Sequence, residues 1–260
     1  MKRREFIRKS SSLIALPFLP LAFEREKFKI RTVVLDPGHG GKDPGTIGKY
    51  LKEKDVVLKI ALRVGEYIEK NVPEVKVVYT RKTDKFIELN ERSAIAMRNK
   101  ADLFISIHAN AIANPATYGT ETWVMGLHKS EENLAVAKRE NSVIMYEDNY
   151  EQHYEGFDNS TESIIMMSLI QNAYLESSVK FADKIEKQFK NKAGRHSRGV
   201  KQAGFVVLYK TATPSVLVES GFLSNQAEEK FLGTDDGQDL IASGIYRAFK
   251  EYKSEVESIN

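Results

Sequence analysis

The amino-acid sequence predicts a single α/β domain, built on a mostly parallel, six-stranded twisted sheet between layers of helices. Three observations lead to this prediction. A chain of 260 residues with 42% hydrophobic and 29% charged residues is long enough for one large globular core. Six short, nearly continuous apolar runs have the pattern of strands that are covered on both faces. Helical patterns alternate with these runs, which is the arrangement that gives a parallel sheet.

The predicted strands are short apolar runs. In chain order they cover 30–35, 76–80, 102–107, 120–125, 205–209 and 215–219. The predicted helices place apolar side chains on one stripe, as the first helix does with Val57, Ile60, Ala61, Val64 and Ile68. These helices cover 53–70, 88–101, 164–189 and 237–252. No internal repeat or long linker interrupts the alternation, so we expect no second folded domain.

The N-terminal residues 1–25 have the pattern of an export signal. Adjacent arginines, Arg3 and Arg4, precede an apolar run of 11 residues, from Leu13 to Phe23, that contains two prolines. A helix that spans a bilayer needs about 20 apolar residues, so this run is too short to be a membrane anchor. The pattern resembles a twin-arginine signal and predicts an exported, periplasmic protein with no transmembrane segment in the mature chain. The alternative is a basic tail.

Removal of that signal changes the charge of the chain. The full chain has 39 basic and 36 acidic residues, and residues 1–25 contain six of the basic and two of the acidic ones. Without them, 33 basic and 34 acidic residues remain, which gives a net charge of −1. The mature chain therefore lacks the basicity typical of nucleic-acid-binding domains, and we expect no nucleic-acid partner. The sequence contains no cysteine. Any bound metal ion must therefore be held by His, Asp or Glu side chains.

Three chemically useful side chains follow or end predicted strands. His39 lies in the glycine-rich turn "DPGHGGKDPG" after the first strand, His108 ends the third, and Glu219 ends the sixth. Because ligands of open α/β sheets bind beyond the carboxyl ends of the strands, we expect these side chains to lie close together. Glu53 begins the first helix, near the same edge. A His, Glu, His set with an open position is the ligand arrangement of a catalytic zinc, and a further carboxylate can move the proton of a water molecule.

Each of these residues also has a structural interpretation. His39 can cap the glycine turn, and the glycines can form an anion-binding nest. Glu53 can favour the N-terminus of its helix through the helix dipole, and His108 can be a hydrogen-bonded core residue. Glu219 is the hardest to explain in this way, because an ionised carboxylate at a buried strand end needs a partner. Taken together, the four residues favour a metal site.

Five motifs occur in order along the chain: "VVLDPGHGGKDPG", "KEKDVVLKIA", "ADLFISIHANA", "RGVKQAGFVVL" and "PSVLVESGFLSN". They resemble the successive motifs of the zinc-dependent N-acetylmuramoyl-L-alanine amidases, which cleave peptidoglycan. The resemblance implies a catalytic domain over 28–253 that binds one catalytic Zn²⁺ through His39, Glu53 and His108, with Glu219 as the catalytic residue. It also implies hydrolysis of the amide between N-acetylmuramic acid and the L-alanine of the stem peptide, in cell-wall remodelling or daughter-cell separation.

Residues 130–163 form an insertion where a short connection would suffice. Its part 146–163 has six acidic residues and no Lys or Arg. The stretch "LAVAKRENS" is similar to a segment by which some family members cover the cleft and offer a glutamate to the zinc until an activator protein removes it. The resemblance makes Glu140 the blocking ligand, and the competing candidates are Glu147, Glu151 and Glu155. If the fourth strand runs parallel to its neighbours, the insertion begins on the cleft side; a solvated acidic loop is the alternative.

Two further residues are candidates for contacts with the substrate, peptidoglycan. Asn110 lies just past His108, and Arg198 lies in the motif before the predicted fifth strand. Two other functions fit much of the same pattern. A zinc carboxypeptidase of the wall peptide would use similar ligands, and a non-catalytic wall-binding or division scaffold would keep the fold alone. Such a scaffold would be marked by loss of Glu219 or of a zinc ligand, and the sequence has lost neither.

Overall fold

The computed structural model describes residues 28–148, 153–154, 160–170 and 172–258, so the predicted export signal lies outside the described residues. At its centre is a six-stranded sheet in the order β2–β1–β3–β6–β4–β5. The strands are β1 (Thr32–Pro37), β2 (Lys76–Tyr79), β3 (Leu103–Asn110), β4 (Thr120–Met125), β5 (Ser197–Ala203) and β6 (Ser215–Phe222). Neighbouring strands are parallel except for β4 and β6, which confirms the predicted, mostly parallel sheet.

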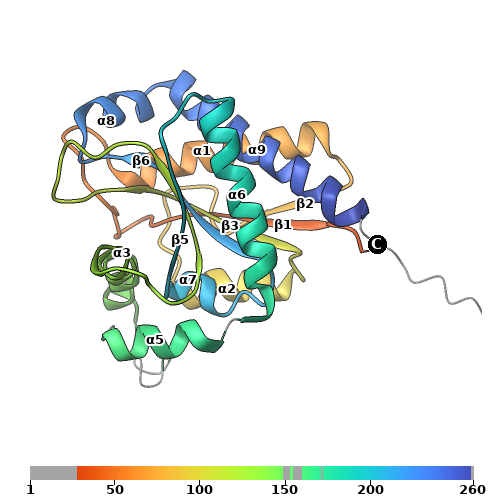
Figure 1. The fold of residues 1–260 in the computed structure, drawn as a ribbon, viewed down its shortest axis with the longest axis horizontal. Coiled ribbons are helices and arrows are strands. Elements are labelled where there is room, and N and C mark those ends of the chain that lie inside the picture. The colour runs from red at the N-terminus through yellow and green to blue at the C-terminus, as the bar shows by residue number, and fades with distance from the viewer. Residues whose placement is uncertain (1–27, 149–152, 155–159, 171, 259–260) are drawn as a thin grey trace, which may run out of the picture.

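Helices cover both faces of the sheet (Figure 1). One layer contains α1 (Glu53–Asn71), α6 (Leu175–Asn191) and α9 (Asp235–Ser258), and the other contains α2 (Leu89–Arg98), α3 (Glu131–Asn141) and α7 (Val206–Tyr209). Two further helices are α5 (Thr161–Ile170) and α8 (Gln226–Leu232), and a 3-10 helix, η2 (Ser142–Tyr146), follows α3. No helix in the described ranges is long and apolar enough to cross a membrane.

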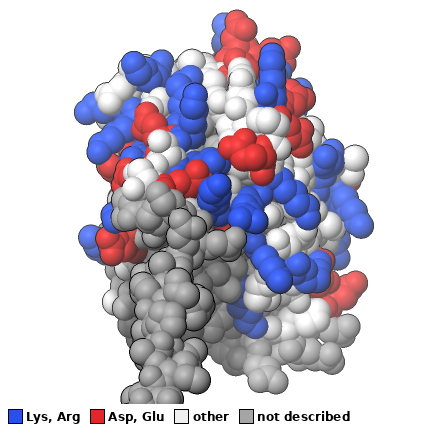
Figure 2. Space-filling model, turned by 90° about the vertical axis from the view of Figure 1, so that its right-hand side faces the viewer, with Lys and Arg blue, Asp and Glu red and all other residues white. Residues whose placement is uncertain are grey.

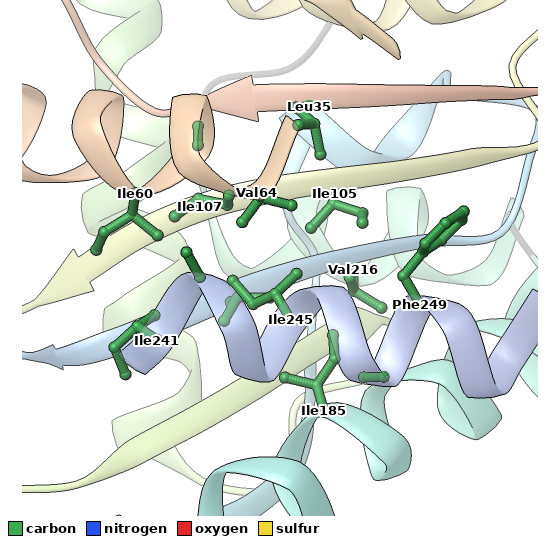
Figure 3. Close-up of a cluster of buried hydrophobic side chains, with 14 of the residues drawn as sticks. Leu35, Ile60, Val64, Ile105, Ile107, Ile185, Val216, Ile241, Ile245 and Phe249 are labelled. Atoms are coloured by element: carbon green, nitrogen blue, oxygen red, sulfur yellow. The ribbon is translucent and has the colours of Figure 1, made fainter. Parts of the chain in front are cut away.

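The larger core lies between the sheet and the layer of α1, α6 and α9 (Figure 3). Ile60 of α1, Ile105 of β3 and Ile245 of α9 meet there, and each is completely buried. Burial of one such side chain contributes about 1.5–3 kcal/mol. The predicted apolar stripe of α1 therefore faces the sheet, and this packing places the first residue of α1, Glu53, at the carboxyl edge of β1 and β3.

Surface charges are mixed. On the face shown in Figure 2, Lys and Arg side chains are interspersed with Asp and Glu side chains. Within the helices of the described chain, several charged side chains form ion pairs one turn apart, such as Lys180 with Glu176 and Lys187 with Asp183 on α6. Exposed pairs of this kind contribute little to stability, typically about 0–1 kcal/mol. The packed core, rather than these pairs, therefore holds the sheet edge in place.

The prediction of the fifth strand is wrong. Residues 205–209, predicted as a strand, form the one-turn helix α7, and the strand at this edge is β5. Periodicity cannot distinguish a short buried strand from a buried helical turn, and Val206, Val207 and Leu208 are all buried. The side chains of β5 are mostly half-buried because β5 is an edge strand, so it lacks an apolar run.

The predicted helix 164–189 is also divided. It forms α5 and α6, separated by a short 3-10 helix, η3 (Asn172–Tyr174). The sequence marks no break, because neither glycine nor proline occurs between the two helices. The change lies in the pattern itself: α5 has consecutive apolar residues, whereas α6 has a single stripe that includes Phe181 and Ile185. Among the side chains that the structure describes, those of α6 line the larger core and none of α5 does.

A buried ion pair holds the end of β1 next to the glycine-rich turn. Arg92 of α2 is completely buried and donates from Nη1 to Asp36 Oδ1 at 2.8 Å. Its Nη2 donates to the carbonyl of His39 at 2.8 Å. The hydroxyl groups of Thr80 and Ser106 also donate to Asp36. These contacts join β1, β2, β3 and α2 at the point where the turn begins.

We expect Asp36→Asn to lower the free energy of unfolding at pH 7 by about 3–5 kcal/mol, because it leaves the Arg92 charge buried without its partner. Burial opposes ionisation of Asp36, but Arg92 and the two hydroxyl groups outweigh it and lower the pKa of this carboxyl. A carboxyl with a lowered pKa stabilises the fold above its unfolded pKa, about 3.9, and this contribution is lost as the pH falls through the folded value. Urea unfolding should show the difference between wild type and variant shrinking below about pH 4. A difference that stays constant from pH 7 to pH 3 would contradict this role for the pair.

Candidate metal centre

The glycine-rich turn after β1 brings His39 to the site. His39 itself has a left-handed backbone, with φ of 59°. At Gly45, where φ is 64°, an added Cβ would lie 2.6 Å from the His39 ring and 2.7 Å from the Glu53 carboxylate. At Gly38 an added Cβ would lie 2.4 Å from the His108 ring. Glycine at these two positions therefore allows the turn to lie directly against the three side chains.

Four buried side chains converge from four elements. His39 follows β1, Glu53 begins α1, His108 lies in β3, and Glu140 lies in the last turn of α3. His39 Nε2 is 3.1 Å from Glu53 Oε1 and 3.4 Å from Glu140 Oε2. His108 Nδ1 is 3.1 Å from each of the same two oxygen atoms. The structure thus brings together the three predicted zinc ligands and the predicted blocking glutamate.

The spacing of these four atoms fits a tetrahedral metal ion. With the bond lengths of zinc sites, about 2.0–2.1 Å, two ligand atoms of a tetrahedron lie about 3.3 Å apart. The four separations between a histidine nitrogen and a carboxylate oxygen are 3.1–3.4 Å, and all the ligand atoms lie within 4.8 Å of one another. His39 Nε2 and Glu140 Oε2 are buried and have no hydrogen-bond partner among the described residues, although buried polar atoms normally have one. Two imidazoles and two carboxylates in this arrangement have the ligand chemistry of zinc.

The other ring nitrogen of each histidine is held from outside the cluster. His39 Nδ1 lies 2.7 Å from Asp43 Oδ2, and His108 Nε2 lies 3.1 Å from the Ser106 hydroxyl. Such partners fix the orientation of ligating histidines and support their basicity. Glu53 in turn accepts hydrogen bonds from the backbone N–H groups of Thr46 and Ala109. The rings are therefore oriented before any ion binds.

The charges in the cluster stabilise one another. Burial disfavours a charged His108, yet the Glu140 carboxylate beside it raises the pKa of His108 to about 9. Burial also disfavours a charged His39, but the Glu53 carboxylate outweighs burial and raises the pKa of His39 well above its usual range. The two imidazoles outweigh burial at the carboxylates and lower the pKa values of Glu53 and Glu140. A divalent cation at this point would replace the two ring protons, so its binding would release protons.

Glu219 lies in β6, level with His108 in β3 and with Glu121 in β4. It is completely buried, and neither of its carboxylate oxygens accepts a hydrogen bond from a described residue. Arg139 Nη2 lies 3.8 Å from Glu219 Oε1. Burial, together with the Glu140 carboxylate, raises the pKa of Glu219 well above its ordinary value. A carboxyl in this condition, one strand away from His108, is suited to take up and give back a proton.

Helix α3 carries Glu140 to the cluster from the insertion. β4 runs antiparallel to β6, so the chain leaves β4 at the end of the sheet away from Glu219. The insertion was expected to begin on the cleft side if β4 ran parallel to its neighbours. Because β4 is antiparallel to β6, the insertion begins at the other end of the sheet. Instead α3 brings the chain back, and Arg139 fixes its last turn. Arg139 Nη2 donates to Glu140 Oε1 at 2.9 Å, and its Nη1 donates to the carbonyl of Ala111 at 2.6 Å.

The competing candidates for the blocking ligand do not lie at the cluster or cannot be placed. Glu147 is buried, but its Oε1 accepts a hydrogen bond from the Leu89 backbone at 2.6 Å, and Tyr154 donates to its Oε2 at 2.8 Å. These contacts cap the N-terminus of α2. Glu151 and Glu155 lie outside the described residues. Of the four candidate glutamates, Glu140 is therefore the one that the described part of the chain places beside the histidines.

Both predicted substrate contacts, Asn110 and Arg198, bind a carboxylate that the sequence analysis missed. Glu121 of β4 is 1% exposed and accepts hydrogen bonds from Asn110 Nδ2 at 2.8 Å and Arg198 Nε at 3.1 Å. Lys201 of β5 also forms an ion pair with it. The signal for Glu121 was available, since a carboxylate inside the apolar strand "TETWVM" is as unusual as Glu219 in its own strand.

Comparison with known proteins places this site in a family. The sequence profile of the family described as N-acetylmuramoyl-L-alanine amidase (Amidase_3) matches residues 33–251. The chain belongs to this family. The N-acetylmuramoyl-L-alanine amidase AmiC of Escherichia coli is 37% identical over 233 residues, which are 85% of this chain and 52% of AmiC. AmiA of Escherichia coli is 36% identical over 225 residues, which are 85% of this chain and 76% of AmiA.

A solved structure shows the same architecture. The CwlD amidase from Clostridioides difficile, determined in complex with the GerS lipoprotein, superimposes with a TM-score of 0.63 at 26% identity. The match covers 86% of this chain and 99% of CwlD. The resemblance predicted from the five sequence motifs is therefore confirmed at the level of family and fold. The region matched by the family contains all four residues of the cluster and Glu219.

Proposed function

We propose that this chain is an exported, periplasmic zinc amidase. It would hydrolyse the amide between N-acetylmuramic acid and the L-alanine of the peptidoglycan stem peptide, in cell-wall remodelling or daughter-cell separation. The observation that carries the proposal is the convergence of His39, Glu53, His108 and Glu140, with ligand atoms within 4.8 Å of one another, beside the buried Glu219, which accepts no hydrogen bond from a described residue. His39, Glu53 and His108 would hold the ion, and membership of the amidase family supports the choice of substrate.

The chain's own residues perform the proton transfer. A zinc ion at the cluster would supply Lewis acidity for the scissile carbonyl and would lower the pKa of a water molecule. Glu219 takes the proton of the attacking water and passes it to the leaving nitrogen of L-alanine. Asn110 is a candidate for a substrate contact in this step, because its side-chain oxygen is buried and has no partner among the described residues.

The cleaved bond distinguishes this function from its rivals. Purified sacculi would be digested with zinc-loaded protein that lacks residues 1–27, and the products would be identified by mass spectrometry. New L-alanine amino termini on the released peptides are expected. Freed C-terminal D-alanine would instead indicate a zinc carboxypeptidase, and intact sacculi after lid removal and full zinc loading would indicate a non-catalytic scaffold.

We further propose that residues 130–163 act as a lid that keeps the enzyme inactive. Glu140 Oε2 lies 3.1 Å from His108 Nδ1, so it would take the ligand position that the attacking water needs. A partner that binds the open state better would shift the chain towards activity. A precedent for a partner exists in CwlD, whose structure was determined with GerS bound. A closed state favoured by about 3 kcal/mol would leave about 1% of the molecules open.

Glu140→Ala is expected to raise basal wall hydrolysis several-fold without an activator, because it frees the fourth ligand position. Replacement of residues 144–163 by a short Gly/Ser linker should act in the same direction. Dye release from labelled sacculi measures the rate, and Glu131→Ala, at the exposed start of the same helix, serves as the control. If both variants are folded and zinc-loaded but no more active than wild type, the segment is a platform for substrate or partner and not a lid.

A further inference from the structure

A cavity of about 430 Å³ lies beside the metal cluster, between α3 and the strands β4 and β5. Its walls include Arg198 and Lys201, and each cation is placed over an aromatic ring that also lines the cavity. The Arg198 guanidinium lies 5.3 Å from the centre of the Phe222 ring, and Lys201 Nζ lies 5.1 Å from that of the Trp123 ring. Contacts of this kind hold the cations against the wall of the cavity.

The cavity wall on the sheet side carries an excess of positive charge. The buried Glu121 carboxylate pairs with both Arg198 and Lys201, so it balances only one of the two cations. Arg198 donates to Glu121 through Nε, and the described residues provide no partner for its two Nη groups. A guanidinium held in this way presents two parallel N–H groups, the geometry that binds a carboxylate. The acidic residue on the opposite wall, Glu132, belongs to α3 and would leave with the lid.

The position of Glu219 fixes the direction of the substrate, if the proposed function holds. Because Glu219 gives its proton to the leaving nitrogen, that nitrogen must face Glu219, and the stem peptide continues from it. The metal cluster lies on the β1 and β3 side of β6, whereas β4 and β5 lie on the other side. The peptide therefore leaves over β4 towards β5. The muramoyl group lies on the opposite side, where a cavity of about 140 Å³ is lined by Gly45 and Thr46.

We propose that the sheet-side wall of this cavity, which carries Arg198 and Lys201 of β5, binds a carboxylate of the stem peptide once α3 has moved away. In this proposal Arg198 determines the specificity, and Glu121 is a positioning residue that orients Arg198. β5 lies two strands from β6, a distance of about 10 Å at the usual strand spacing. Two to three extended residues span about this distance. The carboxylate is therefore that of the second or third residue of the peptide.

The test uses three soluble muramoyl tripeptides: one with its carboxyl groups free, one amidated at the second residue, and one amidated at the third. A hydrogen-bonded charge contributes about 1.5–3 kcal/mol, so wild-type kcat/KM should be at least about tenfold lower for one of the amides. Arg198→Gln should lower kcat/KM for the free acid by a similar factor, mainly by raising KM. For the amide that wild type cleaves less efficiently, the same variant should change kcat/KM by less than about twofold. Because the fraction of open molecules affects all substrates equally, it cancels from the ratio.

Two further variants complete the design. Lys187→Gln removes an exposed cation on α6. It should change neither kcat/KM for the three substrates nor the ratio between the free acid and the amides. Arg198→Lys keeps the positive charge but lacks the two parallel N–H groups, so it should still prefer the free acid over the amide, by a smaller factor than wild type. This variant also tests the proposal if Arg198→Gln fails to fold. Equal rates of wild type on all three substrates, or equal losses for Arg198→Gln on all three, would overturn the inference and place Arg198 elsewhere in the site. Cleavage of none of them by wild type, even with the lid removed, would instead count against the proposed amidase function.

Discussion

Glu219→Gln is expected to lower turnover by about 10²–10⁴-fold, the usual contribution of general acid–base catalysis. The amide has nearly the same shape as the carboxyl group but cannot accept the proton of the attacking water. Glu219 is not one of the four residues of the candidate metal cluster, so the zinc content of the variant should stay near one ion per chain. Hydrolysis of a soluble muramoyl peptide, zinc analysis and thermal unfolding would be measured on the same preparation.

A matched control separates the loss of chemistry from the loss of a buried carboxyl. Glu186 of α6 is also buried, but it accepts hydrogen bonds from the hydroxyl groups of Thr120, Thr122 and Ser197 and lies outside the cluster. A glutamine at this position would keep an oxygen that accepts from these hydroxyl groups, and the hydroxyl oxygens can accept from its amide N–H groups. Glu186→Gln should therefore keep most of the activity. If Glu219→Gln retained more than about a tenth of the wild-type rate, Glu219 would be removed from the mechanism.

The main architecture could be predicted from the sequence because its signals are local. Continuous apolar runs mark β1, β3 and β6, and chemically useful side chains stand where these strands end. For parallel strands that is enough to bring His39, His108 and Glu219 to one edge of the sheet. The same reasoning failed at β5, where an edge strand lacks the apolar run and a buried helical turn next to it has one.

The rest of the site depends on relations that no local pattern contains. The contact of Glu121 with Arg198 and Lys201 requires β4 to run antiparallel to β6, so that its start, not its end, lies beside Glu219. Nothing within the sequence of β4 specifies that direction. The contacts of Arg139 depend on the return of α3 from the far end of the sheet. Glu140 was identified through a resemblance, and spacing alone also offered Glu147, which caps α2 instead.

His39→Ala and His108→Ala are each expected to remove the zinc and the activity together. In the proposed open state three protein ligands would hold the ion, and either change would leave two, which make a poor site. In the proposed closed state Glu140 would add a ligand, so each variant should retain more zinc than the same variant combined with Glu140→Ala. The zinc content would be measured by mass spectrometry after dialysis against a chelator, with Glu140 present and with Glu140→Ala added.

A graded series distinguishes a ligand from a residue that merely supports the fold. Asp43→Ala removes the partner 2.7 Å from His39 Nδ1 but no ligand, so the zinc affinity should fall by only about 10–100-fold. His196→Ala removes an exposed ring that packs at a tilt against Tyr118, outside the cluster, and should leave the affinity unchanged. The expected losses therefore decrease from His39 and His108 through Asp43 to His196. Stoichiometric zinc at wild-type affinity in either His39→Ala or His108→Ala would show that the histidine in question does not bind the ion, whatever its distance from the other three side chains.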